Sequence, residues 1–247
     1  MPNDRLRDAL TRKGLTPAEL AETLHVDPKT VERWITQSRT PYPRHRHAIG
    51  AMLGETERYL WPDALSPDEA TDAARSELVE LYPHRNSVQA DLWDRLLANA
   101  TREIGVLVYV GMFLTEQPSL IKTLRGKGKS GTRVRLMFGN PASREVIRRS
   151  EDEGIGKTSI PAKVRNALAY FHPLEGAAGV EIRCHGTTLY NSIFRYDDEM
   201  IVNPHVYGFG APHAPALHLR RLSGGDLFDT YAESFERVWA AAKPPKW

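Results

Sequence analysis

The sequence contains a single cysteine, Cys184, among its 247 residues. One cysteine excludes an intrachain disulfide and any zinc site built from several cysteines, so the fold must depend on packing for its stability. No stretch approaches the run of about 18 apolar residues that a membrane-spanning helix needs. The first ten residues also lack the apolar core of a signal peptide. We therefore expect a cytoplasmic protein that makes no membrane contact.

Net charge is also small, at +2, and by itself does not indicate a nucleic-acid-binding protein. The charges are unevenly distributed along the chain. Cations outnumber Asp27 and Glu32 between residues 27 and 47, where they are Lys29, Arg33, Arg39, Arg44 and Arg46. Between residues 121 and 165, twelve Lys and Arg residues stand against four Asp and Glu residues. The sequence thus has two basic segments whose role needs an explanation.

Capping signals divide the first sixty residues into short helices. Thr16 stands before Pro17 and three residues before Glu19, which is the pattern of a capping box with proline at the first helical position. Asp27 and Pro28 repeat the cap-and-proline pattern before the next helix. The turn between these two helices is so short that they can pack only at a steep angle. The N-terminal end of the later helix should then project from the surface.

The segment TPAELAETLHVDPKTVERWITQSRTPYPRHRHAIGAMLG resembles the Cro/repressor class of helix-turn-helix DNA-binding domains, the XRE-like group. The resemblance implies that the helix after Asp27 reads the major groove of double-stranded DNA. Because one such domain contacts one half-site, we also expect a homodimer. The implied base or phosphate contacts are Lys29, Thr30 and Arg33, and the implied contacts to the DNA backbone are Arg39, Arg44 and Arg46. The alternative is a helical bundle that binds another protein and whose basic residues are solvated.

We expect a helix-turn-helix domain over residues 1–62, a linker over residues 63–77 and a larger domain over residues 78–247. The linker is acidic and punctuated by proline. Tyr59, Leu60 and Trp61 form the large apolar cluster next to it, and we expect them to dock on one domain or on a partner subunit. Trp34 is expected in the core of the first domain.

From residue 78 onward, apolar runs of strand length alternate with helical patterns. Strands are expected at residues 103–111, 132–141 and 180–186, with helices at 92–100, 119–128, 142–154 and 159–171. A hairpin at 189–203, a strand at 216–222 and a helix at 226–242 follow. This order predicts an α/β domain with a parallel central sheet that the hairpin extends into a mixed sheet flanked by helices.

Ligands bind at the C-terminal ends of strands in sheets of this kind. The polar residues expected at these ends and in the hairpin suit a phosphate or a sugar, and they are Tyr109, Asn140, His185, Asn191, Arg195, Asn203 and His205. The basic run RGKGKSGTRVR at residues 125–135 lacks the order of a P-loop and is expected to be a solvated loop, or else a phosphate site or second DNA contact. His205, His213 and His218 have no spacing typical of metal ligands, so we expect no metal and no cofactor.

The order of elements over residues 88–242 resembles one half of the phospholipase D superfamily. In that superfamily the site strand carries the motif His-x-Lys-x-x-x-x-Asp, with histidine as the nucleophile and lysine as the phosphate clamp. With Asp198 as the aspartate, the histidine and lysine positions hold Asn191 and Ile193; with Asp197 they hold Tyr190 and Ser192. Neither register supplies an imidazole or an ammonium group. The resemblance therefore implies a binding domain without phosphohistidine chemistry.

The sequence as a whole predicts a transcriptional regulator and not an enzyme. In this hypothesis the first domain binds an operator, while the degenerate phospholipase D-like domain dimerises, senses an anionic small ligand, or does both. The alternative is a nuclease or phosphodiesterase of the phospholipase D type that the helix-turn-helix brings to DNA. A third interpretation is a partner-binding module in which a ligand triggers assembly.

Overall fold

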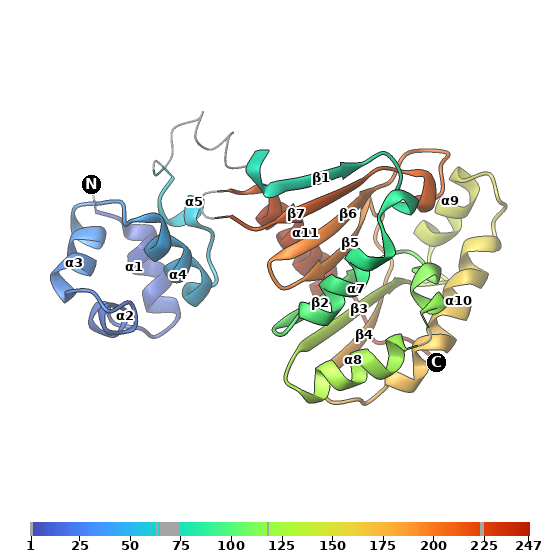
Figure 1. Ribbon diagram of the computed structural model, residues 1–247, viewed down its shortest axis with the longest axis horizontal. Helices are drawn as coiled ribbons and strands as arrows, with labels where there is room; N and C mark the ends of the chain where they lie inside the picture. Colours follow the sequence, from blue (N-terminus) through green and yellow to red (C-terminus); the bar gives the residue numbers. More distant parts are fainter. Residues whose placement is uncertain (1, 63, 65–74, 118, 223–224) are drawn as a thin grey trace. The chain divides into compact units, whose positions relative to one another are not determined.

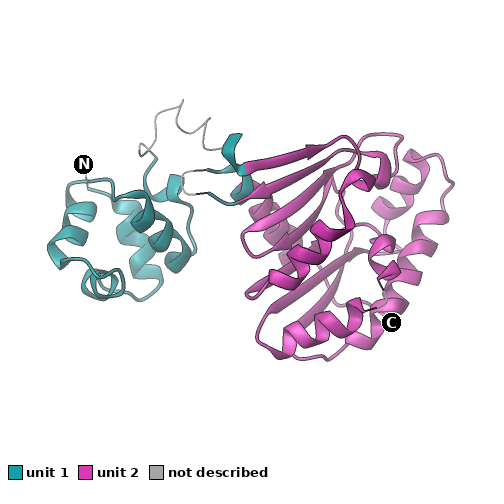
Figure 2. Ribbon diagram, viewed as in Figure 1, with its two compact units in different colours: residues 1–77, 221–229 teal, residues 78–220, 230–247 magenta. Residues whose placement is uncertain are grey.

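The computed structural model describes residues 2–62, 64, 75–117, 119–222 and 225–247 (Figure 1). The chain divides into two compact units (Figure 2). Unit 1 comprises residues 1–77 and 221–229, and unit 2 comprises residues 78–220 and 230–247. In the part of the chain that the structure describes, no helix is long and apolar enough to cross a membrane.

Residues 2–62 of unit 1 contain helices and no strand. The helices are α1 (Asp4–Arg12), α2 (Pro17–Thr23), α3 (Pro28–Thr36), α4 (Pro43–Leu53) and α5 (Glu57–Leu60). The predicted capping box is confirmed, because the Glu19 backbone N–H donates to Thr16 Oγ1 at 3.2 Å and the Thr16 N–H donates to Glu19 Oε2 at 2.7 Å. Asp27 caps α3 by accepting from the Lys29 N–H at 2.8 Å.

One apolar core holds these helices together. Its members come from each of the five helices and from the residue after α5, and they are Leu6, Ala9, Leu10, Leu20, Ala21, Val31, Trp34, Ile35, Ile49, Leu53, Leu60 and Trp61. Trp34 is thus confirmed as a core residue. Leu60 and Trp61 pack into the core of their own unit, whereas Tyr59 is partly exposed beneath the guanidinium of Arg5.

Unit 2 is built on a seven-stranded mixed sheet with the strand order β1-β7-β6-β5-β2-β3-β4. The strands are β1 (Leu78–Tyr82), β2 (Glu103–Leu107), β3 (Arg133–Gly139), β4 (Val180–His185), β5 (Asn191–Tyr196), β6 (Glu199–Pro204) and β7 (Ala216–Arg220). Strands β2, β3 and β4 are parallel, and the remaining neighbours pair antiparallel. The predicted mixed sheet is confirmed, but its parallel strands lie at one end and not at the centre, because β4 is the edge strand.

Helices cover both faces of this sheet (Figure 1). On one face, α7 (Ala90–Asn99) packs Trp93 against Phe194 of β5 at a ring distance of 5.1 Å. The helices α8 (Leu120–Lys129) and α10 (Ser159–Phe171) also contact the sheet. On the other face, α11 (Leu227–Ala241) brings Phe235 against Gly105 of β2. The remaining helical segments are η1 (Arg85–Ser87), η2 (Met112–Glu116), α9 (Arg144–Asp152), η3 (His172–Leu174) and η4 (Ala211–His213).

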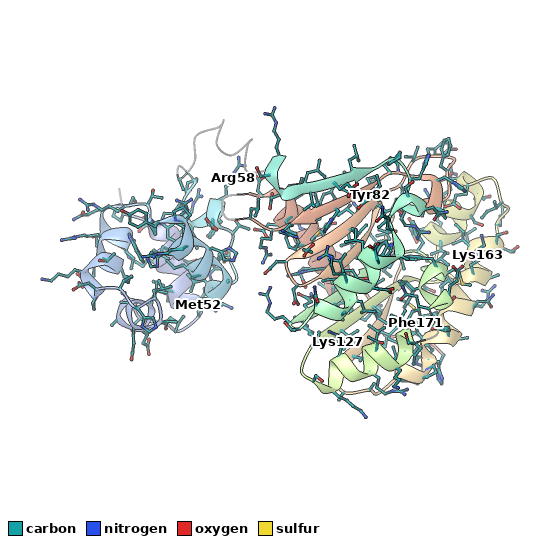
Figure 3. The ribbon with its side chains drawn as sticks, viewed as in Figure 1. Met52, Arg58, Tyr82, Lys127, Lys163 and Phe171 are labelled. Atoms are coloured by element: carbon teal, nitrogen blue, oxygen red, sulfur yellow. The ribbon has the colours of Figure 1, made fainter. Side chains whose placement is uncertain are left out.

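The basic run at residues 125–135 differs from its predicted loop. Its first residues continue α8 to Lys129, and Arg133 begins β3. Lys127, labelled in Figure 3, donates to the carbonyl of Ala100 at 2.7 Å and so caps the end of α7. Arg125 donates to the carbonyl of Pro173 at 2.6 Å. These two cations make contacts inside the domain, whereas Lys129 and Arg133 of the same run are exposed.

Two glycines of α8 should respond oppositely to alanine. A Cβ at Gly128 would lie 2.2 Å from the carbonyl oxygen of Ala178, whereas a Cβ at Gly126 meets nothing within 4 Å. We expect Gly128→Ala to destabilise the domain by about 2 kcal/mol through overpacking. Gly126→Ala should stabilise it by about 0.5–1 kcal/mol, because alanine favours a helix interior. Urea unfolding of both variants checks this, and equal effects would contradict the close approach of α8 to residue 178.

Candidate functional site

The first candidate site is a hollow of about 510 Å³ in unit 1, here called the basic hollow. It lies between α3 and the start of α4, and its wall includes Thr30, Arg33, Arg39 and Arg44. The structure therefore brings together four of the six residues predicted to contact DNA. Lys29 does not line the hollow, but it is exposed on the first turn of α3.

The three arginines of the basic hollow, and Lys29 on the first turn of α3, are not neutralised by the protein. Lys29, Arg33, Arg39 and Arg44 are all exposed, and none of them forms an ion pair within the described residues. Arg44 has a neutral side-chain partner in His45, whose Nε2 accepts from the Arg44 Nε–H at 3.2 Å. Four positive charges are consequently open to an external anion.

Arg46 is placed differently from the other predicted DNA contacts. Only 6% of its side chain is exposed, and its Nε–H lies 3.1 Å from a carboxylate oxygen of Glu57. Its Nη1 donates to the carbonyl of Pro41 at 3.2 Å. This differs from the prediction that Arg46 meets a DNA backbone, because a buried and paired guanidinium cannot reach a phosphate without breaking both interactions. We therefore leave Arg46 out of the interface.

The second candidate site is a hollow of about 660 Å³ in unit 2, here called the strand-end pocket. Its wall is formed by residues 108–113 after β2, by Ser192 at the start of β5, and by His205 directly after β6. Residues 210–213, the connection between α9 and α10, and η1 complete it. The pocket therefore lies at the C-terminal ends of β2 and β6, where open α/β sheets bind ligands.

Ser192, His205 and Tyr109 form a hydrogen-bonded group in the pocket wall. His205 donates from Nδ1 to the carbonyl of Leu189 at 3.2 Å, so its Nε2 accepts from the Ser192 hydroxyl at 3.0 Å. The ring of Tyr109 stacks on His205 at 5.6 Å, and its hydroxyl accepts from the Leu189 N–H at 2.8 Å. Burial, with a smaller contribution from the charge of Arg149, lowers the pKa of His205 to about 4. At neutral pH the imidazole is uncharged.

Three cations and two carboxylates line the strand-end pocket. Arg149 is neutralised, because its Nε–H donates to a carboxylate oxygen of Glu153 at 2.7 Å. Lys163 and Glu116 are exposed, and Lys163 is seen on α10 in Figure 3. Arg85 is half-buried, with its guanidinium 4.0 Å from the ring centre of Phe113.

Only Tyr109 and His205 among the seven predicted ligand residues line this pocket. Arg195 lies on the α11 side of the sheet, where it pairs with Glu103 at 3.1 Å. His185 is buried, donates from Nε2 to the carbonyl of Val108 at 3.1 Å and accepts at Nδ1 from Thr187.

The three other predicted ligand residues are Asn140, Asn191 and Asn203. Asn140 accepts from the Ala142 N–H in the turn after β3, and Asn191 opens β5 opposite Pro204. Asn203 is fully buried and donates to the carbonyl of Pro215 at 2.7 Å. These hydrogen bonds and positions serve turns and strand pairing, and none of the three residues is part of the pocket wall.

The acidic turn of the hairpin is structural. Asp197 accepts backbone N–H groups from Thr101 and Arg102, both at 2.9 Å, and from Glu103 at 2.6 Å. It thereby fastens the β5–β6 turn to the start of β2. Of the four residues that stand at the nucleophile and clamp positions of the two motif registers, only Ser192 lines the pocket.

Arg85, Phe113 and Arg149 could not be recognised as pocket residues from the sequence, since they come from η1, η2 and α9 and meet only in the folded domain. The contact between Arg85 and Phe113 could have been predicted only if the two residues were neighbours in the sequence. They are far apart in the chain, so no local pattern indicates it. Within the described ranges, no group of three or more His, Cys, Asp or Glu residues is arranged to hold a metal ion.

The depressed pKa of His205 predicts a loss of stability in mild acid. Its pKa is about 4 in the folded protein against an ordinary value of 6.5. The contribution of His205 is therefore complete above pH 6.5 and is lost as the pH falls from about 6.5 to about 4, by about 3 kcal/mol at most. In His205→Asn this part of the pH dependence should disappear, while the part due to His185, whose pKa is also lowered by burial, remains. Unfolding free energies measured from pH 7.5 to 4 check it, and identical pH profiles would contradict it.

Comparison with known proteins gives one family match. Residues 75–246 match the model of a family described as "Domain of unknown function (DUF5919)". None of the curated proteins matches the chain. Among solved structures, the archaeal chromatin protein TrmBL2 is similar at 12% identity and a TM-score of 0.42, over 82% of this chain and 62% of TrmBL2, so the chain spans less than two thirds of that protein. Nuc from Salmonella typhimurium, a phospholipase D family member, is similar at 11% identity and a TM-score of 0.41, over 68% of this chain and 99% of Nuc.

Proposed function

Because the chain belongs to the DUF5919 family, whose description assigns no activity, we propose a function from the two sites themselves. The protein acts as a DNA-binding transcriptional regulator. Unit 1 binds double-stranded DNA through the basic hollow, and the strand-end pocket of unit 2 binds a small effector. The active form is a homodimer in which each chain contacts one half-site.

The observation that carries this proposal is a set of four cations without ion pairs in the described residues, namely the three arginines that line the basic hollow and Lys29 on the first turn of α3. Lys29, Arg33, Arg39 and Arg44 are exposed within one small helical region that has its own core. Phosphate contacts from Lys and Arg supply most of the affinity of a protein for DNA. A protein-binding surface would instead be expected to present large apolar or aromatic side chains at its centre. Among the residues that line the basic hollow, Tyr42 is the one large apolar or aromatic side chain that is strongly exposed.

The salt dependence of DNA binding tests the proposal. Each phosphate contact contributes about −0.9 to the slope of log K against log salt concentration, so four cations predict roughly −3 to −4 per chain and about twice that for a dimer. Fluorescence anisotropy of the full-length chain with a labelled duplex measures this slope. A slope near zero, or no binding at low salt, would contradict a DNA-binding role for unit 1.

The effector role rests on the strand-end pocket. Its volume of about 660 Å³ is within the range of about 300–1,000 Å³ usual for small-molecule sites. A regulator of this design needs the effector to bind the DNA-competent and the incompetent states with different affinity, because a ligand with equal affinity for both shifts nothing.

The alternative is hydrolysis at the pair formed by Ser192 and His205. A serine hydroxyl that donates to an imidazole in a pocket is an arrangement that nucleophilic catalysis uses. Here the other ring nitrogen faces the carbonyl of Leu189 and not a carboxylate, and the pKa of His205 is about 4. Such an imidazole is a weak base at neutral pH. We therefore favour binding over catalysis, and expect no turnover of bis(p-nitrophenyl) phosphate or p-nitrophenyl acetate above that of the His205→Asn variant.

A further inference from the structure

Arg85 is the one cation of the strand-end pocket that is both withdrawn from water and unpaired. Burial lowers its pKa to about 10, and the charge of Glu116 acts on it only from beyond ion-pair distance. Among the described residues no carboxylate pairs with it. A guanidinium in such surroundings loses hydration and gains no counter-ion from the protein, so an external anion would be bound there with little competition.

The other charged groups of the pocket are less suited to this role. Arg149 is held by Glu153 and also donates to the carbonyl of Phe209 at 2.8 Å. Lys163 is exposed, so solvent screens its charge. The pocket therefore offers one strong anion contact, which suits a singly charged carboxylate better than a doubly charged phosphate. A planar guanidinium can also bind a carboxylate through two parallel hydrogen bonds.

The remaining wall suits an apolar ring. Aliphatic side chains contribute much of it, and they are Val108, Val110, Met112, Ile155 and Ile160. Phe113 and the stacked rings of Tyr109 and His205 add aromatic surface. The polar atoms of Ser192, His205 and Tyr109 already bond one another or the backbone at Leu189. A sugar hydroxyl placed against this inner part of the wall would find these polar atoms already bonded, and unpaired buried hydroxyl groups oppose binding.

We propose that the strand-end pocket binds an organic monoanion, a carboxylate carried on an aromatic or cycloaliphatic ring, with Arg85 pairing the carboxylate and the apolar wall enclosing the ring. This inference deepens the proposed effector role and rests on it. It is tested by ligand binding in the absence of DNA. The ligand can therefore fail to bind while DNA binding by unit 1 is confirmed, and DNA binding can fail while the ligand binds.

The probes are four ring carboxylates, namely benzoate, cyclohexanecarboxylate, indole-3-acetate and 2-naphthoate. They are compared with their four methyl esters, glucose 6-phosphate and inorganic phosphate, by calorimetry and thermal shift on the full-length chain. We expect at least one ring carboxylate to bind with a stoichiometry of one per chain. Its methyl ester should bind at least ten-fold more weakly, and glucose 6-phosphate and inorganic phosphate should produce no saturable signal.

Variants at Arg85 assign the contact. Arg85→Gln should weaken the binding of the ring carboxylate at least ten-fold, and Arg85→Lys, which keeps the charge, should weaken it less. Arg165→Gln is the matched control, because Arg165 is an exposed cation of α10 outside the pocket wall, and it should leave binding unchanged. Thermal unfolding without ligand verifies that each variant is folded. The proposal is overturned if no ring carboxylate binds, if a sugar phosphate is preferred, or if Arg85→Gln and Arg165→Gln behave alike.

Discussion

A chain with both Arg33 and Arg39 replaced by alanine is expected to bind its DNA site roughly 100-fold more weakly than the unaltered chain, or worse. The estimate follows from about 1–3 kcal/mol for each arginine that contacts a base or a phosphate. Both side chains line the basic hollow and are exposed without an ion pair in the described part of the chain. Their removal therefore breaks no salt bridge and should leave the helical core intact. Anisotropy titration at one fixed salt concentration gives the comparison.

The matched control carries the same loss of charge elsewhere. Lys13 and Arg165 are exposed cations that lie outside the basic hollow and, among the described residues, outside any ion pair. Lys13→Ala combined with Arg165→Ala should reduce affinity by less than about three-fold, since charges far from the phosphates act only through a screened field. Equal losses in the two double variants would show that net charge alone drives binding and would remove the basic hollow from the account.

Replacing Arg135 of β3 by methionine should cause the largest loss of stability in unit 2. Its side chain is 1% exposed and bonds carboxylates of Glu103 and Glu236. The guanidinium also lies 4.7 Å from the ring centre of Phe235. Removing one partner from a buried charge cluster costs about 3–5 kcal/mol. Because Glu103 keeps Arg195 as a partner, we expect the lower end of this range.

Thermal unfolding measures the effect of Arg135→Met. A loss of about 3 kcal/mol corresponds to a fall in Tm on the order of 10 °C for a domain of this size. Arg133 of the same strand is exposed, so Arg133→Met should change Tm by no more than about 2 °C, as surface substitutions do. A fall of similar size in both variants would mean that strand propensity, and not the buried cluster, governs the result.

Local signals in the sequence were sufficient to predict most of the secondary structure. Thr16 with Glu19 and Asp27 with Pro28 are contacts within one turn, and they were confirmed as caps of α2 and α3. The runs of β2 and β3 were predictable because a parallel strand inside a sheet is apolar on both faces. Strand β4 is at the sheet edge and is only partly buried, and its apolar residues still indicated a strand. The Trp34 side chain was predicted as core from its spacing with Val31 and Ile35.

The features that the sequence did not reveal depend on contacts between distant residues. Strand β1 was not predicted, because LVELY is exposed at four of its five positions and shows no alternation of apolar and polar residues. The close approach of Gly128 to the carbonyl of Ala178 also joins residues that are distant in the chain. The prediction that Arg46 contacts DNA was wrong because its partner in the ion pair, Glu57, is eleven residues further along the chain. Arg85 enters the strand-end pocket only because η1 lies against η2, which no local pattern encodes.

Selection of random double-stranded DNA by the purified full-length chain, at near-physiological salt, tests the central claim most directly. Non-specific phosphate binding fades under these conditions, while specific readout persists. The account predicts enrichment of a short sequence present twice, with centres separated by about one helical turn, roughly 34 Å, or a multiple of it. Enrichment should vanish in the Arg33→Ala, Arg39→Ala variant. No enriched sequence from a chain shown to be folded would contradict a sequence-specific regulator.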